Sequence, residues 1–584
     1  MPTPWLPYLI DLYGRERAPE IASRLEAVIT AHTGGRSNAE GRTISLSERD
    51  ALLITYGDQV TAPGETPLRT LAQVCDERLQ GLVSGVHILP FYPWTSDDGF
   101  SVVDYRAIDP ALGAWEDVRA LGRRFRLMFD GVINHISASS AWFQGFLRDE
   151  PRFRDFFVVV EGDPDLSQVV RPRALPLLTT FQTAAGEKRV WTTFSADQID
   201  LNAQNPDVLL EIVDVLLGYA AEGADFIRLD AIAYLWKEIG TTCIHLPQTH
   251  AVVQFLRAAL NEAAPHVHLI TETNVPHVDN ISYFGDGTNE AQLVYNFALP
   301  PLTLHAFYTG DAQILSNWAK TLTLPSDKTT FFNFLASHDG IGVNPARGIL
   351  SNADIDSLVE KTLAHGGLIS YKHNADGTQS PYEMNINFFD ALSNPSLLHP
   401  SLLQPPSSAA GTPPQASFES PDLQVSRFIA AQAIMLSLIG VPGIYFHSLF
   451  GSRGWTEGVK QTGRNRTINR EKCQFDDLQK QLADENSLRF KVFTKYSQLL
   501  KTRSSSAAFH PHGTQTVLNL HSSVFAIERI SPDEKSRVLC LHNVSEKRIS
   551  FTAKYESAHD LFTGQEIQIS NLTLELFQVL WLKV

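Results

Sequence analysis

The feature that most constrains the fold is a series of eight short apolar segments, with stretches of helical apolar spacing between them. Strands of a parallel sheet that is covered on both faces are apolar throughout, and helices connect them. Eight such units predict an α/β fold of the (β/α)₈ barrel type. The eight candidate strands are residues 51–57, 85–92, 125–135, 224–231, 267–274, 293–299, 330–339 and 441–447.

The remaining stretches break this alternation, and 584 residues exceed what one core normally organises. Residues 4–32 carry apolar residues at helical spacing, whereas the last segments alternate as antiparallel strands do. The predicted division is an N-terminal helical extension at 1–48, a catalytic barrel at 49–147, 201–340 and 421–507, an inserted domain B at 148–200, an inserted loop domain at 341–420 with a Pro/Ser-rich segment near 396–421, and a C-terminal β-domain at 508–584.

The net charge of −16 excludes a broad basic surface, so a nucleic-acid partner is not expected. A phosphate site in such a chain must be local and built from a few arginines. The four cysteines are scattered without metal-ligand spacing, which predicts buried or idle thiols. We find no signal peptide and no apolar stretch of membrane-spanning length, and we therefore expect a cytoplasmic protein without a membrane partner.

Three carboxylates follow apolar segments at the ends of candidate strands: Asp230, Glu272 and Asp339. Side chains at the carboxyl ends of barrel strands form the active site of this fold. Retaining glycoside cleavage needs two carboxyl groups about 5–5.5 Å apart, one as nucleophile and one as proton donor. The sequence therefore indicates a glycoside-cleaving site.

The motifs around these carboxylates resemble those of the α-amylase superfamily, glycoside hydrolase family 13. They are Asp130-Gly-Val-Ile-Asn134-His135, Arg228-Leu-Asp230, Thr-Glu272-Thr and Ser-His338-Asp339. The resemblance implies that Asp230 is the nucleophile, Glu272 the general acid/base and Asp339 the transition-state stabiliser. It also implies that His135 and His338 bind the donor glucose and that Arg228 orients the nucleophile.

Within the superfamily, the chain is most similar to the sucrose-phosphorylase branch, through RPRALPLLTTF, RLDAIAYLWKEIGTTCIHLPQTH, YNFALPPLTLHAF and SHDGIGV. This branch generally lacks the calcium that amylases bind near the position of Asn134. Residues 148–200 offer no acidic cluster to complete such a site, so neither a metal nor a cofactor is expected. The resemblance implies that Asp97 and Arg466 clamp the glucose and that Phe100 and Phe194 form an apolar platform. It implies phosphate or acceptor binding by Arg173, Tyr382 and Tyr234, with Arg171 as the alternative arginine.

The acceptor site departs from sucrose phosphorylases, because Glu383 stands where their loop presents a glutamine. Segment 366–392 is more similar to branch members that act on glucosylglycerate or glucosylglycerol. Lys372, His373 and His245 are candidates to bind a glycerate carboxylate.

The predicted function is a retaining phosphorylase that converts glucosylglycerate and phosphate to glucose 1-phosphate and glycerate. Sucrose and glucosylglycerol are alternative donors. A hydrolase or transglucosidase is the second hypothesis, and a non-catalytic binding module is the last. The expected partners are these small molecules, with a homodimer left open.

Overall fold

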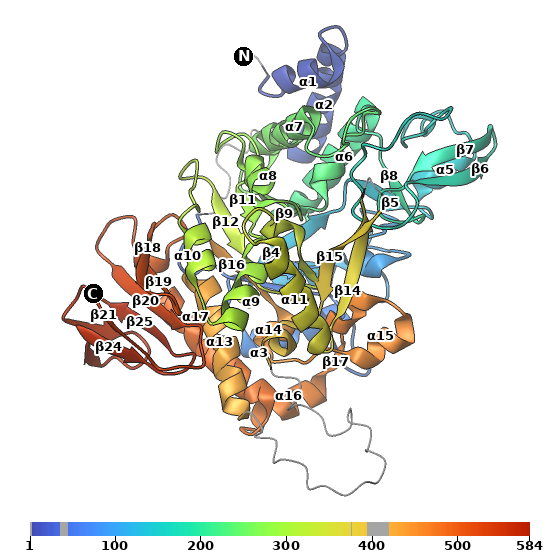
Figure 1. Cartoon of the computed structure of the whole chain (residues 1–584). Helices are drawn as coiled ribbons and strands as arrows, with labels where there is room; N and C mark the ends of the chain where they lie inside the picture. The colour runs from blue at the N-terminus through green and yellow to red at the C-terminus, as the bar shows by residue number, and fades with distance from the viewer. Residues whose placement is uncertain (1–2, 35–44, 375–376, 394–419) are drawn as a thin grey trace, which may run out of the picture.

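The computed structural model describes residues 3–34, 45–374, 377–393 and 420–584. All eight candidate strands contribute to one closed parallel barrel, in the order β1-β16-β12-β11-β10-β9-β4-β3 (Figure 1). The predicted (β/α)₈ barrel is therefore confirmed. Its strands are β1 Leu52–Thr55, β3 Gly85–Ile88, β4 Arg126–Gly131, β9 Ala224–Leu229, β10 His268–Thr271, β11 Leu293–Tyr295, β12 Thr330–Asn333 and β16 Val441–Tyr445.

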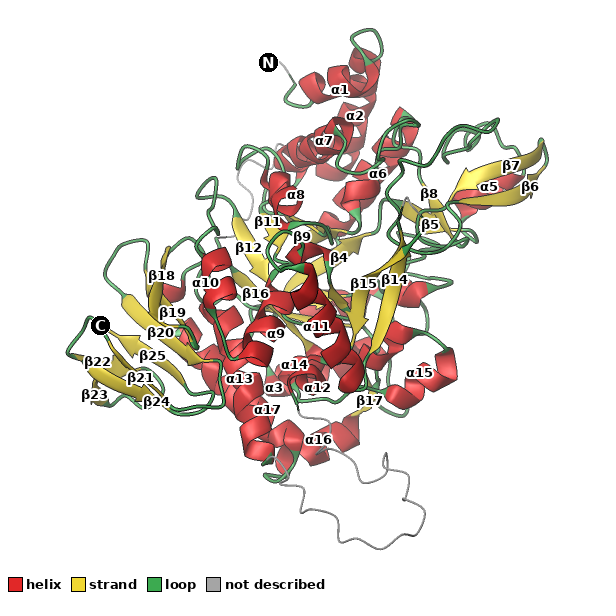
Figure 2. Cartoon of the chain, viewed as in Figure 1, coloured by secondary structure: helices red, strands yellow, loops and turns green. Residues whose placement is uncertain are grey.

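Helices surround the barrel, as the red ribbons around the central yellow strands show (Figure 2). Asn205, Ser420 and Ser487 each accept a backbone N–H bond at a helix start, and these caps fix where the preceding loops end. In the described residues no helix is long and apolar enough to cross a membrane. The main barrel helices are α3 Pro67–Arg78, α4 Trp115–Gly122, α6 Pro206–Ala221, α7 Pro247–Ala263, α9 Leu299–Thr309, α13 Pro421–Ser437 and α17 Leu488–Ser504.

Two insertions follow the carboxyl ends of β4 and β12, which places both at the barrel mouth. In the first, β5 His135–Ser137 pairs with β8 Gln198–Asp200, and β6 Leu178–Thr183 pairs with β7 Gly186–Trp191. The second contains β13 Ile341–Gly342, β14 Leu368–His373 and β15 Gln379–Asn385 in one small sheet. Of the predicted Pro/Ser-rich segment, residues 396–419 lie outside the described residues.

The N-terminal segment folds as two helices, α1 Leu6–Tyr13 and α2 Ala18–Thr33, at the top of Figure 1. Ion pairs Arg24–Asp207, at 2.5 Å, and His32–Asp214, at 2.8 Å, hold α2 against α6. The predicted domain boundaries stay a proposal.

The C-terminal part is antiparallel and contains β18 Thr514–His521, β19 Val524–Ile530, β20 Arg537–Asn543, β21 Ile549–Thr552, β22 Ser557–Asp560, β23 Glu566–Gln568, β24 Asn571–Leu574 and β25 Val579–Lys583. Residues 572–584 contain two strands, β24 and β25, and not one continuous strand. The chain turns at Phe577, whose φ is 52°, so β24 and β25 join different sheets.

Candidate active site

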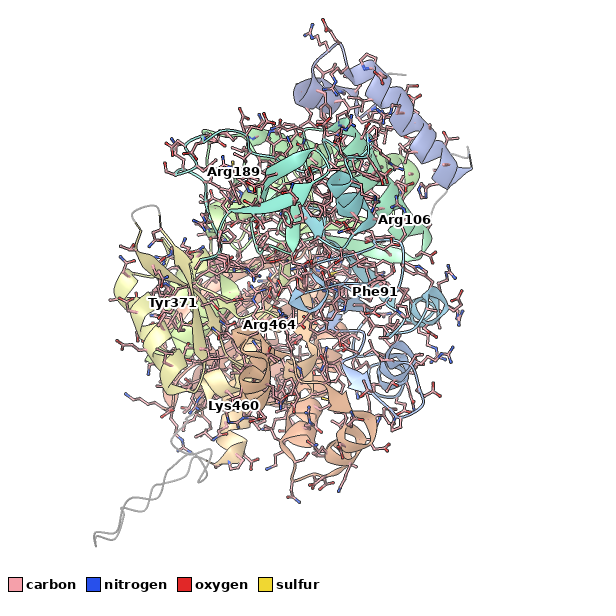
Figure 3. The ribbon with its side chains drawn as sticks, turned by 90° about the vertical axis from the view of Figure 1, so that its right-hand side faces the viewer. Phe91, Arg106, Arg189, Tyr371, Lys460 and Arg464 are labelled. Atoms are coloured by element: carbon pink, nitrogen blue, oxygen red, sulfur yellow. The ribbon has the colours of Figure 1, made fainter. Side chains whose placement is uncertain are left out.

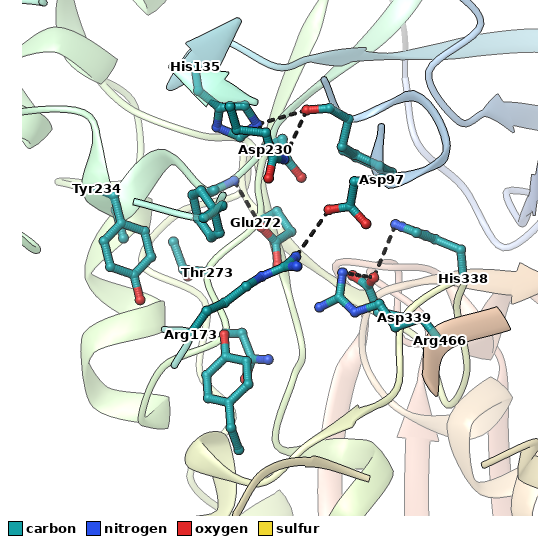
Figure 4. Close-up of a pocket in the computed structure, with 17 residues that line it drawn as sticks. Asp97, His135, Arg173, Asp230, Tyr234, Glu272, Thr273, His338, Asp339 and Arg466 are labelled. Atoms are coloured by element: carbon teal, nitrogen blue, oxygen red, sulfur yellow. Dashed lines mark hydrogen bonds and ion pairs between the residues drawn. The ribbon is translucent and has the colours of Figure 1, made fainter. Parts of the chain in front are cut away.

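Two of the three predicted carboxylates are adjacent because their strands are neighbours. Asp230 directly follows β9 and Glu272 directly follows β10. The parallel register pairs Thr271 with Leu229, so the next residue on each strand stands side by side at the barrel mouth. Asp339 arrives from the loop after β12, and all three line one cavity (Figure 4).

One buried guanidinium, that of Arg228, contacts this pair. Its Nη1 donates to Oδ1 of Asp230 at 2.9 Å, and its Nη2 lies 3.9 Å from Oε2 of Glu272. Asp130 accepts a second bond from Arg228 and is itself 2.7 Å from Nε2 of His87. These contacts fix Arg228 next to Asp230 and Glu272. Sequence reasoning missed His87, which sits inside β3 without a motif.

Burial raises the pKa of both Asp230 and Glu272. The positive charge of Arg228 acts in the opposite direction and lowers both pKa values. The guanidinium is closer to Asp230, so it favours the negative charge there. Glu272 in turn accepts the backbone N–H of Ala231 at 2.9 Å, so each of the two carboxylates has its own hydrogen-bond donor.

Asp339 is in a different electrostatic setting. Its Oδ1 lies 2.6 Å from Arg466, 3.3 Å from Arg470 and 3.5 Å from Nε2 of His338. Burial by itself would raise its pKa, but Arg466 and Arg470 hold that pKa far below the usual value. Asp339 is therefore a permanent anion within the cavity.

Aromatic rings form one wall of the cavity. Phe100 stacks on His338 with ring centroids 4.8 Å apart, and Phe194 lies against His135 at 5.2 Å. The Nε2 atom of His135 bonds the carbonyl of Phe100 at 2.8 Å. Burial lowers the pKa of both histidines, to about 3 for His338, so both rings are neutral near pH 7.

The inner cavity, of about 60 Å³, opens into an outer cavity of about 560 Å³. Five residues line both: Asp97, Arg173, Gln198, Tyr382 and Arg466. The inner cavity is completed by Phe100, His135, Phe194, Asp230, Ala231, Ala233, Tyr234, Glu272, Thr273, Asn274, His338 and Asp339. The outer cavity is completed by Ser96, Pro172, Ala174, Leu175, Ser195, Ile369, Ser370, Tyr371, Glu383, Gly463, Arg464, Asn465 and Arg470.

Arg173 stands where the two cavities meet. Its Nη2 lies 3.0 Å from Oδ2 of Asp97, and its guanidinium is over the ring of Phe194 at 5.7 Å. Burial would raise the pKa of Asp97, but Arg173, Arg466 and Arg470 lower it to about 2. The backbone at Asp97 has a φ of 53°, which turns this carboxylate toward the cavity. Arg171, the alternative, instead bonds the carbonyl of Leu175.

Three residues predicted for the acceptor are placed differently from expectation. Neither His245 nor Lys372 is among the described residues that line the two cavities. His245 bonds the hydroxyl of Tyr283 at 3.0 Å. Glu383 lines the outer cavity, but its carboxylate already accepts from the N–H of Gly340 at 2.8 Å and from Arg466 at 3.1 Å. The side chain of His373 lies outside the described set.

Asn134 marks the position near which amylases bind calcium, and here a lysine ammonium supplies the positive charge beside it. Lys237 lies 2.8 Å from Oδ1 of Asn134 and 2.6 Å from Oδ2 of Asp200, and all three are buried. In the described part of the chain no group of three His, Cys, Asp or Glu side chains is arranged to hold a metal ion. The expectation of no metal stays a prediction.

Two further residues of the site were missed by sequence reasoning. Gln198 lines both cavities and donates to the carbonyl of Phe100 at 3.2 Å. Arg470 bonds the carbonyl of His338 at 2.9 Å and also pairs with Asp98 and Asp339. Arg466 and Arg470 belong to one short segment, Asn-Arg-Thr-Ile-Asn-Arg at 465–470, and the second arginine of this segment was the available signal.

Comparison with known proteins agrees with this geometry. Residues 79–343 match the model of the α-amylase catalytic domain. The chain is 50% identical over 579 residues to glucosylglycerate phosphorylase of Allomeiothermus silvanus, covering 99% of this chain and 98% of the relative. It is 44% identical to glucosylglycerate phosphorylase of Escherichia coli, covering 99% of both chains.

Among solved structures, the fold is similar to that of sucrose 6F-phosphate phosphorylase from Thermoanaerobacter thermosaccharolyticum. The TM-score is 0.72 at 23% identity, and the match covers 91% of this chain and 99% of the other. Three findings indicate the same family: the full-length identity to the phosphorylases, the barrel topology and the order of the three carboxylates. The chain therefore belongs to the α-amylase family, glycoside hydrolase family 13, on its sucrose-phosphorylase branch.

Proposed function

We propose that this protein is a retaining phosphorylase that converts glucosylglycerate and inorganic phosphate to α-glucose 1-phosphate and glycerate. The observation that carries the proposal is the pairing of Asp230 and Glu272 around Arg228, in a cavity that also presents Arg173. Two relatives of nearly equal length bear the name glucosylglycerate phosphorylase, which supports the choice of donor.

In the first displacement, the carboxylate of Asp230 attacks the anomeric carbon of the glucosyl group. Glu272 gives its proton to the glycosidic oxygen. This oxygen therefore leaves as the hydroxyl group of glycerate. Arg228 holds the carboxylate of Asp230 in place through its bond to Oδ1. The charge on Asp339 stabilises the oxocarbenium-like transition state, while Arg466 fixes the orientation of Asp339.

In the second displacement, a phosphate oxygen attacks the glucosyl carbon from the side that glycerate has left. The bond to Asp230 breaks, and Glu272 receives a proton from the incoming phosphate. Two inversions give net retention. Arg173 suits the phosphate because a guanidinium donates two parallel hydrogen bonds to such an anion. We propose that Tyr234 and Tyr382, which line the same cavity, assist it.

Product analysis tests the proposal. The purified protein is incubated with glucosylglycerate, sucrose or glucosylglycerol, with and without phosphate. We expect α-glucose 1-phosphate to form fastest from glucosylglycerate, and only with phosphate present. Faster cleavage of sucrose or glucosylglycerol would contradict the assignment of glucosylglycerate as the donor. Glucose as the main product in the presence of phosphate would instead favour a hydrolase or transglucosidase.

A further inference from the structure

Four arginines line the outer cavity, and three of them are already paired with carboxylates. Arg173 pairs with Asp97 at 3.0 Å, Arg466 with Asp339 at 2.6 Å, and Arg470 with Asp339 at 3.3 Å. Arg464 is different: among the described residues no ion pair is found for its guanidinium, and it is exposed at the cavity wall.

The backbone around Arg464 is fixed on both sides. Gly463 ends helix α15 Thr456–Thr462 in the left-handed region with a φ of 67°, and the N–H of Arg464 bonds Oγ1 of Thr462 at 3.2 Å. On the other side, Asn465 donates to the carbonyl of Ile369 at 3.4 Å, which ties the segment to β14. Arg464 is thus presented from an anchored turn.

Arg464 lies on the same face of the molecule as Tyr371, which also lines the outer cavity (Figure 3). Phosphate oxygens must stay close to the anomeric carbon, next to Arg173. The carboxylate oxygens of a glycerate are three bonds from the glycosidic oxygen, whereas the free oxygens of a phosphate are two bonds from its attacking oxygen. The carboxylate therefore reaches farther from the anomeric carbon than the phosphate does. The outer cavity adjoins the inner one, and Arg464 is its arginine without an ion pair among the described residues.

We infer that Arg464 binds the carboxylate of the acidic acceptor and selects glycerate over glycerol. The inference rests on the proposed function and deepens it. The inner cavity is crowded with carboxylates, so a cation that is not paired with a protein carboxylate suits an anionic acceptor. Among the described residues Arg464 is such a cation at the wall of the outer cavity, whereas Lys372 and His245 lie outside its lining.

The test runs the reaction in reverse, with glucose 1-phosphate as donor and either glycerate or glycerol as acceptor, and phosphate release as the readout. The variants are Arg464→Ala and Arg464→Lys. Matched controls are Lys460→Ala, which removes one exposed charge from the preceding helix, together with Lys372→Ala and His245→Ala. Phosphorolysis of glucosylglycerate at varied phosphate gives the KM for phosphate.

We expect Arg464→Ala to raise the KM for glycerate by about 10- to 100-fold, as loss of a charge-assisted hydrogen bond does. The KM values for glycerol and for phosphate should change less than about threefold, on the same scale. Arg464→Lys should recover part of the glycerate affinity, and the three controls should resemble the wild-type enzyme.

An unchanged KM for glycerate in Arg464→Ala, or an equal rise for glycerol or phosphate, would overturn this inference and leave the proposed function intact. A loss of glycerate affinity in Lys372→Ala or His245→Ala alone would do the same. A wild-type enzyme that transfers glucose to glycerol or fructose but not to glycerate would overturn the proposed function, and this inference with it.

Discussion

The inner and outer cavities differ in the origin of their side chains. In the inner cavity Asp230 and Glu272 directly follow neighbouring barrel strands, and the register of these strands brings them together. The outer cavity is lined by residues 96–97, 172–175, 195, 198, 369–371, 382–383, 463–466 and 470, which come from distant parts of the chain. Residues at strand ends can therefore be predicted from the local sequence. The residues that recognise the acceptor depend instead on how distant loops pack together.

The largest expected effect comes from the inner cavity. Asp230→Asn removes the attacking carboxylate, so kcat should fall by about 10⁴-fold or more, about 5–6 kcal/mol of barrier. Thermal unfolding should show a folded protein. Asp163→Asn, the same chemical change at a fully exposed side chain, is the control. A folded Asp230→Asn enzyme with near-wild-type turnover would contradict the assignment of Asp230 as the nucleophile.

Glu272→Gln tests the proton donor. We expect a loss of about 10²–10⁴-fold with glucosylglycerate and less than about tenfold with α-glucosyl fluoride, whose leaving group needs no proton. Because burial raises the pKa of Glu272 and the acid must be protonated, wild-type kcat/KM should fall as pH rises through that pKa. This alkaline limb should vanish in Glu272→Gln with the fluoride. Equal losses on both donors would contradict the acid role.

Arg173→Ala acts where the two cavities join. Loss of the guanidinium should raise the KM for phosphate by about 10- to 100-fold and shift products from glucose 1-phosphate toward glucose. Arg171→Ala is the matched control, because its guanidinium bonds a carbonyl of the same loop and lines neither cavity. If only Arg171→Ala changes the phosphate dependence, the two assignments must be exchanged.

Glu383→Gln should give the smallest effect. Its carboxylate is occupied by Gly340 and Arg466, so the substitution should loosen Arg466 and raise the KM for every donor about fivefold. The ratio of glycerate to glycerol specificity should stay constant. A selective change toward fructose would restore the sequence-based hypothesis that Glu383 contacts the acceptor.

The sequence by itself determined the barrel and the place of Asp230 and Glu272, which directly follow their strands. Apolar runs specify buried parallel strands. A polar residue directly after such a strand lies at the barrel mouth. Only the tertiary structure decided the partners of the loop residues. Arg173 meets Asp97, and Glu383 meets Arg466 rather than an open acceptor site, because long-range loop contacts set these pairs. Local spacing carries no information on such contacts, and for that reason Arg464 emerged only from the assembled cavity.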